Sequence, residues 1–136
     1  MQIREFTPAD HASVLRLWEE TVGVSASDSL DELAKVLGRD PELFLVAVDG
    51  AAVIGTVIGT WDGRRGWLYH LAVAADRRRR GVATALLAEV ERRLRAKGAR
   101  KVNLLMWRTN EAARALYRRS GYAELEDLAV FTKRLV

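Results

Sequence analysis

Apolar and polar positions alternate at the start of the chain and then take up a helical period. Residues 2–6 alternate, and this period of two predicts a short first strand. Residues 7–23 begin with a proline and an aspartate, carry an apolar stripe at helical spacing and end in a glycine, so they predict a helix. A second helix is predicted to begin near Ser27 or Asp28 and to be terminated by Gly38 and Pro41.

The middle of the chain has the pattern of antiparallel strands. Residues 43–48 and 52–61 are rich in apolar and β-branched side chains. They flank an Asp-Gly pair at 49–50, which is a strong signal for a two-residue hairpin. A second turn at 62–66 precedes another apolar run at 67–73. These features predict three consecutive strands joined by two tight turns.

The second half of the chain alternates between helices and strands. Residues 81–97 have helical period and lead to an apolar strand at 101–107, which predicts a right-handed parallel crossover from the preceding strand. Residues 110–120 predict a further helix, and 122–125 and 129–135 predict two closing strands. The predicted class is α/β (α+β), a mixed sheet with antiparallel N-terminal strands and a central parallel pair.

Length and composition narrow the class of protein. The chain has 136 residues, and we expect residues 1–136 to form a single domain. It has no cysteine, which excludes disulfides and a cysteine nucleophile, and its two histidines, His11 and His70, stand far apart, so we expect no metal site. The N-terminus lacks a signal-peptide pattern, and no run approaches the ~20 apolar residues of a membrane span. We therefore expect a cytoplasmic protein that does not act at membranes.

A cluster of basic residues stands between two predicted elements. The formal net charge is only +4, but four arginines run together at 77–80, and Gly81 and Ala83 follow them at the start of a predicted helix. Unpaired N–H groups at a helix start bind anions, and a glycine lets the backbone approach a ligand closely. The loop therefore suits a pyrophosphate. A solvated helix entrance is one alternative, and a nucleic-acid patch is another, which we do not expect because no aromatic residues interleave the arginines.

Two short motifs occupy the last two predicted helices and their entrances. Residues 78–83 are Arg-Arg-Arg-Gly-Val-Ala, and the second motif comprises Asn110, Ala112, Ala113, Leu116, Tyr117, Gly121 and Tyr122. Together they resemble the phosphate loop and the Asn…Leu-Tyr…Gly-Tyr signature of the GCN5-related N-acetyltransferase (GNAT) superfamily, within which the chain most resembles the small bacterial YpeA-like group. The resemblance covers nearly the whole chain. It implies a three-layer fold whose central parallel strands splay around acetyl-CoA.

The resemblance also implies roles for individual residues. The backbone of residues 71–73 would pair with the pantetheine arm, and one of its amides would polarise the thioester carbonyl. Amides of residues 78–84 would hold the pyrophosphate, Asn110 would contact pantetheine, and Tyr117 would protonate the departing CoA thiolate. The residues expected to bind CoA are Leu71, Ala72, Val73, Arg78, Arg79, Arg80, Gly81, Val82, Ala83, Thr84 and Asn110. The implied activity is direct acetyl transfer to a primary amine, either of a small molecule or of a protein N-terminus.

The general base is not assigned by the resemblance. Relatives carry a glutamate at the positions that correspond to Trp67 or Leu105 here. His70 is an alternative base, or a histidine whose contacts are structural only. The missing carboxylate keeps open a regulatory module that binds CoA without turnover, and the arginines keep open a protein directed at tRNA or another nucleic acid. We expect acceptor specificity to lie in residues 18–30 and in the 61–66 turn, and the protein to be a monomer or homodimer.

Overall fold

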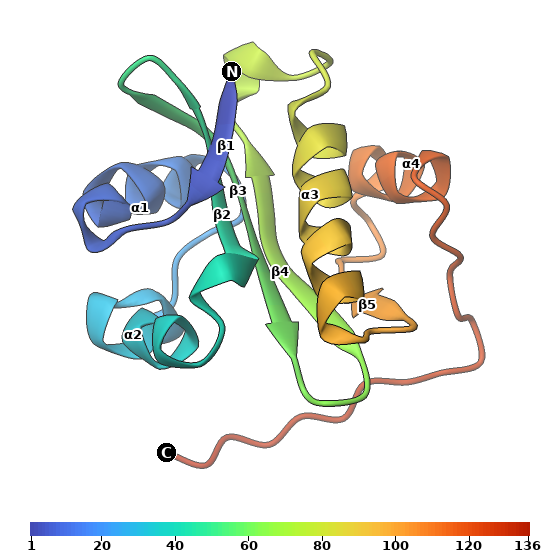
Figure 1. The fold of residues 1–136 in the computed structure, drawn as a ribbon. Coiled ribbons are helices and arrows are strands. Elements are labelled where there is room, and N and C mark those ends of the chain that lie inside the picture. The colour runs from blue at the N-terminus through green and yellow to red at the C-terminus, as the bar shows by residue number, and fades with distance from the viewer. The chain divides into compact units, whose positions relative to one another are not determined.

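The computed structural model describes residues 1–136 and divides them into two compact units, residues 1–105 and residues 106–136 (Figure 1). The first unit holds the sheet and three of the helices, and the second holds one helix and the C-terminal segment. Each unit is described by itself below. The expectation of a single domain stays a prediction.

The first unit is built on one five-stranded sheet in the order β1-β2-β3-β4-β5. The first four strands pair antiparallel with their neighbours, and β4 and β5 pair in parallel. This arrangement confirms the predicted mixed sheet with a parallel pair. The strands are β1 Gln2–Glu5, β2 Phe44–Asp49, β3 Ala52–Trp61, β4 Gly66–Val73 and β5 Val102–Leu104.

Helices cover both faces of this sheet. Helices α1 (His11–Glu20) and α2 (Leu30–Arg39) lie on one face, and α3 (Val82–Lys97) lies on the other (Figure 1). The α1–α2 face encloses a core in which Trp18 and Phe44 are completely buried and stack 6.1 Å apart. The second unit contains α4 (Glu111–Arg119). Helix α3 follows β4 in the chain and precedes β5, as the strand–helix–strand pattern predicts.

Three glycines on the sheet allow α3 to pack closely. A Cβ added to Gly59 would lie 2.7 Å from a methyl carbon of Val90, and one added to Gly66 would lie 2.8 Å from a methyl carbon of Leu94. A Cβ on Gly55 would lie 2.9 Å from Val82. Real Cβ atoms do not approach other carbons this closely, so a side chain at any of these positions would force the α3 side chains facing it to shift. The glycines therefore let α3 pack close to β3 and β4.

We expect Gly59→Ala to lower the free energy of unfolding by about 1–3 kcal/mol, because an added methyl group overpacks the β3–α3 contact. Gly38→Ala is the matched control, since Gly38 lies inside α2 and an added Cβ meets no atom within 4 Å. Alanine there should stabilise the protein by about 0.5 kcal/mol through helix propensity. Urea unfolding of both variants measures the two changes, and equal effects at the two glycines would contradict the close packing.

A buried carboxylate ties β1 to the start of α1. Asp10 accepts two hydrogen bonds from the Arg4 guanidinium, at 2.8 and 2.9 Å, and a third from the Thr7 backbone N–H at 2.9 Å. Only 10% of its side chain is exposed. The hydrogen bonds from Arg4, followed by the bond from Thr7, lower the pKa of Asp10 below its usual value although burial acts to raise it.

We expect Asp10→Asn to lower the free energy of unfolding by about 1–3 kcal/mol at pH 7, where the native carboxylate is ionised. A lowered native pKa contributes stability above the unfolded value of ~3.9, and this contribution is lost as the pH falls through the native pKa. The difference between the two proteins should therefore shrink towards pH 2. Urea titrations at several pH values check this, with exposed Asp31→Asn as the control. A difference that does not depend on pH would contradict the assignment.

Helix α2 begins later than predicted. Ser25 and Asp28 form a capping box around a short 3₁₀ turn at Ala26–Asp28. The Ser29 side chain then accepts a hydrogen bond from the Glu32 N–H at 3.2 Å, so the helix begins one residue after this second cap. The helix ends at Arg39, between Gly38 and Pro41, so the predicted termination is confirmed. Its start lies two to three residues after the predicted Ser27 or Asp28.

The predicted closing strands at 122–125 and 129–135 are also wrong, because these residues form no strand. The predicted strand at 101–107 is reduced to β5. Alternating apolar residues form a strand only where a neighbouring strand takes their backbone hydrogen bonds, and no strand of the sheet pairs with the C-terminal segment. Its large apolar side chains are accordingly exposed: Leu125, Leu128, Val130, Phe131, Leu135 and Val136.

Candidate active site

The parallel pair of strands leaves part of β4 without a neighbour on its β5 side. The β4–β5 register starts at Gly66↔Val102 and ends at Leu68↔Leu104. On its other side β4 stays paired with β3 as far as Val73↔Gly55. Residues 69–73 therefore extend beyond β5, and this stretch contains the segment expected to pair with pantetheine. An extended ligand can add to such a strand edge through backbone hydrogen bonds.

A β-bulge interrupts β4 where it leaves β5. Thr56 pairs with Ala72 and Ile58 pairs with Tyr69, so the single residue Val57 lies opposite two residues, His70 and Leu71. His70 has a φ of 50°, which is uncommon for a residue other than glycine. A bulge leaves one residue of the strand outside the regular ladder and changes the direction of its side chain. The bulge therefore lies immediately before the Leu71–Val73 segment.

The loop after β4 ends in an N-terminus of α3 that carries no side-chain cap. Gly81 is the N-cap residue, with a φ of 80°, and it makes no side-chain hydrogen bond to the helix. A Cβ at Gly81 would meet no atom within 4 Å, so the space beside it is open. The first-turn amides, at Val82, Ala83 and Thr84, thus have no side-chain acceptor from the cap. This backbone geometry is that of an anion-binding helix start.

The four arginines of the loop do not have the same surroundings. Arg77 forms an ion pair with Asp49 in the β2–β3 hairpin, and this contact lowers the pKa of the Asp49 carboxyl. Arg78 makes a long hydrogen bond of 3.4 Å from Nε to the Val73 carbonyl, which connects the loop to the end of β4. Arg79 has a φ of 62°, and residues 78–80 are exposed. The structure therefore brings the predicted residues 71–73 and 78–84 together at one end of β4 and α3.

The second unit carries the other two predicted site residues on α4. Asn110 is the N-cap, and its Oδ1 accepts a hydrogen bond from the Ala113 N–H at 3.1 Å, which confirms the predicted cap. Tyr117 packs edge-on against Tyr122, with ring centroids 5.6 Å apart. Burial raises the pKa of the Tyr117 phenol, so the group stays protonated through neutral pH. That Asn110 and Tyr117 meet the phosphate loop stays a prediction.

A buried hydrogen-bond network surrounds the bulge on the α1–α2 face of the sheet. The Trp18 indole Nε1 donates to Thr56 Oγ1 at 2.8 Å, and that hydroxyl donates to the His70 carbonyl at 2.8 Å. His70 Nε2 lies 2.8 Å from Asp28 Oδ1, and the Asp28 side chain is only 4% exposed. None of Trp18, Thr56 and Asp28 was predicted as a site residue. Asp28 lies within the 18–30 segment that was expected to decide acceptor specificity.

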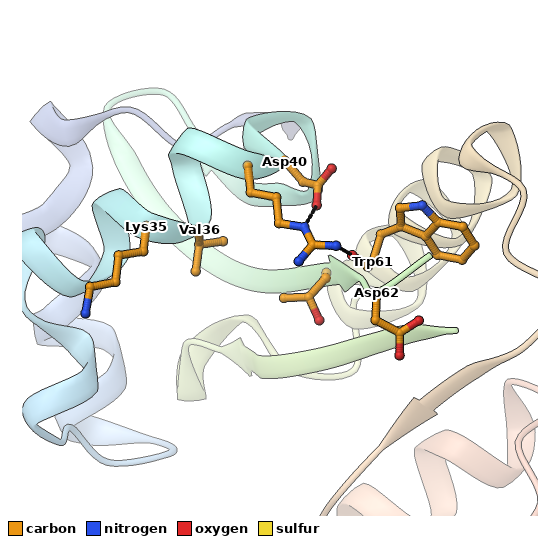
Figure 2. Close-up of a pocket in the computed structure, with 8 residues that line it drawn as sticks. Lys35, Val36, Asp40, Trp61 and Asp62 are labelled. Atoms are coloured by element: carbon orange, nitrogen blue, oxygen red, sulfur yellow. Dashed lines mark hydrogen bonds and ion pairs between the residues drawn. The ribbon is translucent and has the colours of Figure 1, made fainter. Parts of the chain in front are cut away.

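A cavity of about 250 Å³ opens between α2 and the far end of β3 (Figure 2). Arg39 spans it, donating to the Trp61 carbonyl and lying 3.4 Å from the Asp40 carboxylate. Of the charged residues that line the cavity, Arg39 and Asp40 form an ion pair with each other. The cavity includes the start of the 61–66 turn, where acceptor contacts were also expected. It is lined by Lys35, Val36, Arg39, Asp40, Gly59, Thr60, Trp61 and Asp62.

The structure shows neither a cluster of metal ligands nor a membrane-spanning helix. No group of three or more histidine, cysteine, aspartate or glutamate side chains is placed to hold a metal ion. None of the helices has the length and apolar character needed to cross a bilayer. The uncapped α3 N-terminus beside an open strand edge is thus the feature with the clearest ligand chemistry, since its geometry suits a phosphate-bearing, extended ligand.

Comparison with known proteins shows the family to which the chain belongs. Residues 11–122 match the acetyltransferase (GNAT) family. The chain is 38% identical over 137 residues to "Acetyltransferase YE1169" of Yersinia enterocolitica, covering 100% of this chain and 96% of the relative. The chain therefore belongs to the GNAT family of acetyltransferases, and the predicted resemblance is confirmed.

Solved structures with the same fold agree with this assignment. The aminoglycoside antibiotic 6'-N-acetyltransferase AAC(6')-IG of Acinetobacter haemolyticus has a TM-score of 0.80 at 22% identity, covering 100% of both chains. AAC(6')-Iy in complex with the bisubstrate analogue CoA-S-monomethyl-acetylneamine has a TM-score of 0.77 at 23% identity, covering 98% of this chain and 97% of that one. At these identities the likeness shows the fold.

Proposed function

We propose that this acetyltransferase binds acetyl-CoA along β4 and the α3 N-terminus and transfers the acetyl group directly to a primary amine. The observation that carries the proposal is the continuity of two features. The open edge of β4 at residues 69–73 leads through one short loop into the uncapped N-terminus at Gly81. CoA has the matching order of groups, since its pantetheine amides are followed by its pyrophosphate.

The residues at this end of the unit fit acetyl-CoA. The amides of residues 78–84 would hold the pyrophosphate, helped by the α3 dipole and by exposed arginines that make no ion pair in this structure. The backbone of residues 71–73 would pair with pantetheine, and an amide at the bulge would polarise the thioester carbonyl. On the second unit, Asn110 retains its Nδ2 for a ligand, since its cap uses only Oδ1. A glycine at 81 leaves the phosphate approach open.

The transfer step follows from what the chain contains. The sequence has no cysteine, so an acyl-cysteine intermediate is excluded and attack by the amine on the bound thioester remains. The enzyme would mainly orient the two substrates and stabilise the charge that develops on the carbonyl oxygen. Tyr117, protonated at neutral pH, would give its proton to the CoA thiolate.

The acceptor is proposed as a class, not as one compound. Among the structural neighbours, one is named as an aminoglycoside antibiotic 6'-N-acetyltransferase, and another holds a CoA–acetylneamine analogue. Others are named as a ribosomal-protein-S18-alanine N-acetyltransferase and as the NatB acetyltransferase complex bound to a bisubstrate inhibitor. The acceptor class that we propose for this chain is a primary amine, on a small molecule or a protein N-terminus. Cytoplasmic location and a monomeric or homodimeric state remain predictions.

Binding and turnover are tested separately. Acetyl-CoA at 100 times its Kd should stabilise the protein by ~2.7 kcal/mol, which appears as a higher Tm. The same protein should release CoA thiol when supplied with a panel of primary amines: aminoglycosides, polyamines, amino acids and peptides with free N-termini. No change in Tm at millimolar acetyl-CoA would contradict the proposal.

One alternative function rests on the lack of a glutamate at the two positions where a general base would be expected. Trp67 and Leu105 stand where relatives carry a glutamate base, which is compatible with a module that binds CoA without turnover. That module would show the same rise in Tm with acetyl-CoA. Its thiol release would be slow and would not change with any amine of the panel, nor in Tyr117→Phe.

A further inference from the structure

His70 has a strained backbone that its neighbours hold in place. Its φ of 50° lies in the left-handed region, at the β4 bulge. Such conformations persist where surrounding contacts fix them, and they concentrate at functional sites. Here Thr56 Oγ1 donates to the His70 carbonyl, and Trp18 donates in turn to that hydroxyl, with Thr56 and Trp18 both completely buried. The Trp18 ring also packs against the imidazole, with centroids 4.4 Å apart.

Asp28 determines which ring nitrogen of His70 carries the proton. The Asp28 carboxylate is almost fully buried, and its second oxygen accepts the Ser25 N–H at 2.9 Å, so the group is held in one orientation. An ionised carboxylate can only accept a hydrogen bond, so His70 Nε2 donates across the 2.8 Å contact. In the neutral imidazole this leaves Nδ1 without a proton and able to accept one.

Nδ1 of His70 is open to solvent. No hydrogen bond involves it, and no buried side-chain nitrogen or oxygen of the chain lacks a partner, so solvent reaches Nδ1. The His70 side chain is 27% exposed. Nε2 is therefore held by its hydrogen bond to the buried Asp28 carboxylate, while Nδ1 is available to a substrate. This is the division of roles that a base oriented by a carboxylate requires.

The place of His70 in the strand connects it to the reaction. It directly precedes Leu71–Val73, where the proposed function puts the thioester, and Asp28 belongs to the 18–30 segment expected to contact the acceptor. We propose that His70 is the general base of acetyl transfer, with Asp28 as the residue that positions it. This proposal rests on the proposed function.

The proton transfers balance in the following way. An acceptor amine arrives as the ammonium ion, and Nδ1 takes one proton from it to form an imidazolium whose charge faces Asp28. The neutral amine forms the C–N bond, the C–S bond breaks, and the CoA sulfur gains a proton from Tyr117. The nitrogen then loses a second proton, which passes through water to the Tyr117 phenolate and restores the phenol. The imidazolium then returns its proton to water. No oxidant or further reactant is needed.

Two titratable groups belong to the hydrogen bonds around the His70 ring. Asp28 contacts it from the segment between α1 and α2, and His11 of α1 contacts the Asp28 backbone carbonyl through Nε2 at 3.0 Å. The Trp18 face carries no charge. Since the His11 ring hydrogen-bonds to that backbone oxygen and not to the Asp28 carboxylate, His11→Asn is a matched control for a change at His70.

The kinetic test uses His70→Asn, since asparagine tolerates a positive φ but cannot take the proton. The probes are acetyl-CoA and the amine with the fastest turnover in the panel. At pH 7.5 we expect kcat to fall about 100-fold, within the range for loss of a general base, with the KM for acetyl-CoA unchanged. The loss should shrink to less than about 10-fold at a pH above the pKa of the amine, ~10.4 for a lysine-type amine, because that amine then arrives without its extra proton.

Other outcomes separate the two proposals. Wild-type protein that binds no acetyl-CoA overturns the proposed function, whereas an active wild type with an equally active His70→Asn overturns only the role of His70. A loss that is equal at all pH values, or one shared by His11→Asn, also overturns it. Where His70→Asn does not fold, ¹⁵N NMR of the wild-type histidines decides: an Nε2-protonated His70 that loses this preference in Asp28→Asn supports the proposal, and an Nδ1-protonated ring overturns it.

Discussion

Tyr117→Phe should lower kcat by about 100-fold or more and leave the affinity for acetyl-CoA nearly unchanged. The substitution removes only the hydroxyl, and a positioned general acid contributes about 10²–10⁴-fold. Burial raises the pKa of Tyr117, so the phenol is protonated and ready to donate at neutral pH. Because the raised pKa lies above the usual ~10, the wild-type rate should not decline through loss of this proton below about pH 10.

The matched control for this change is Tyr122→Phe. Tyr122 packs against the Tyr117 ring at 5.6 Å, so its variant also loses a phenolic hydroxyl from the same aromatic pair. We expect its kcat to stay within about threefold of wild type. Steady-state rates for both variants, together with the rise in Tm caused by acetyl-CoA, separate chemistry from binding. A Tyr117→Phe enzyme with the kcat of the wild type would contradict the assignment of the acid.

Gly81→Ala should weaken acetyl-CoA binding by about tenfold or more. Its φ of 80° is unfavourable for alanine, and the added Cβ projects into the open space beside the first-turn amides of α3. A phosphate that approaches these amides would meet the methyl group. A tenfold loss corresponds to only ~1.4 kcal/mol of binding free energy, which one displaced backbone contact accounts for.

Gly63→Ala provides a control with similar backbone strain. Gly63 has a φ of 93°, and an added Cβ there also meets nothing within 4 Å, but the residue lies in the turn between β3 and β4. Its variant should lose stability without losing affinity for acetyl-CoA. Calorimetric titration with acetyl-CoA measures the affinity of each of the two variants. Equal affinities of the two variants would show that the loop backbone does not hold the ligand.

The sequence predicted the parts of the fold that have strong local patterns. β2, β3 and β4 follow from β-branched runs around the Asp-Gly turn, and α3 follows from its apolar stripe and the glycine at its C-terminal end. The C-terminal strands were not correctly predicted, because strand formation depends on a partner edge that alternation alone does not supply. The start of α2 was misplaced because two successive caps, at Ser25 and Ser29, lie four residues apart.

The candidate site was predicted in part for the same physical reason. The phosphate loop is contiguous in sequence, so its glycine, its arginines and the helix that follows could be recognised together. The contact between His70 and Asp28 joins residues 42 apart, and it depends on a bulge that breaks the strand alternation. Asp28 also forms a capping box with Ser25, which is a sufficient local reason for an aspartate at this position. Nothing in the sequence separates the two roles.

The central claim is acetyl transfer from acetyl-CoA to a primary amine. The most direct measurement incubates the wild-type protein with acetyl-CoA and the amine panel, and follows both the release of CoA thiol and the mass of each amine. The account predicts at least one amine that gains a single acetyl group in step with thiol release, with both lost in Tyr117→Phe. Thiol release at the same slow rate with every amine, and no acetylated product, would contradict it.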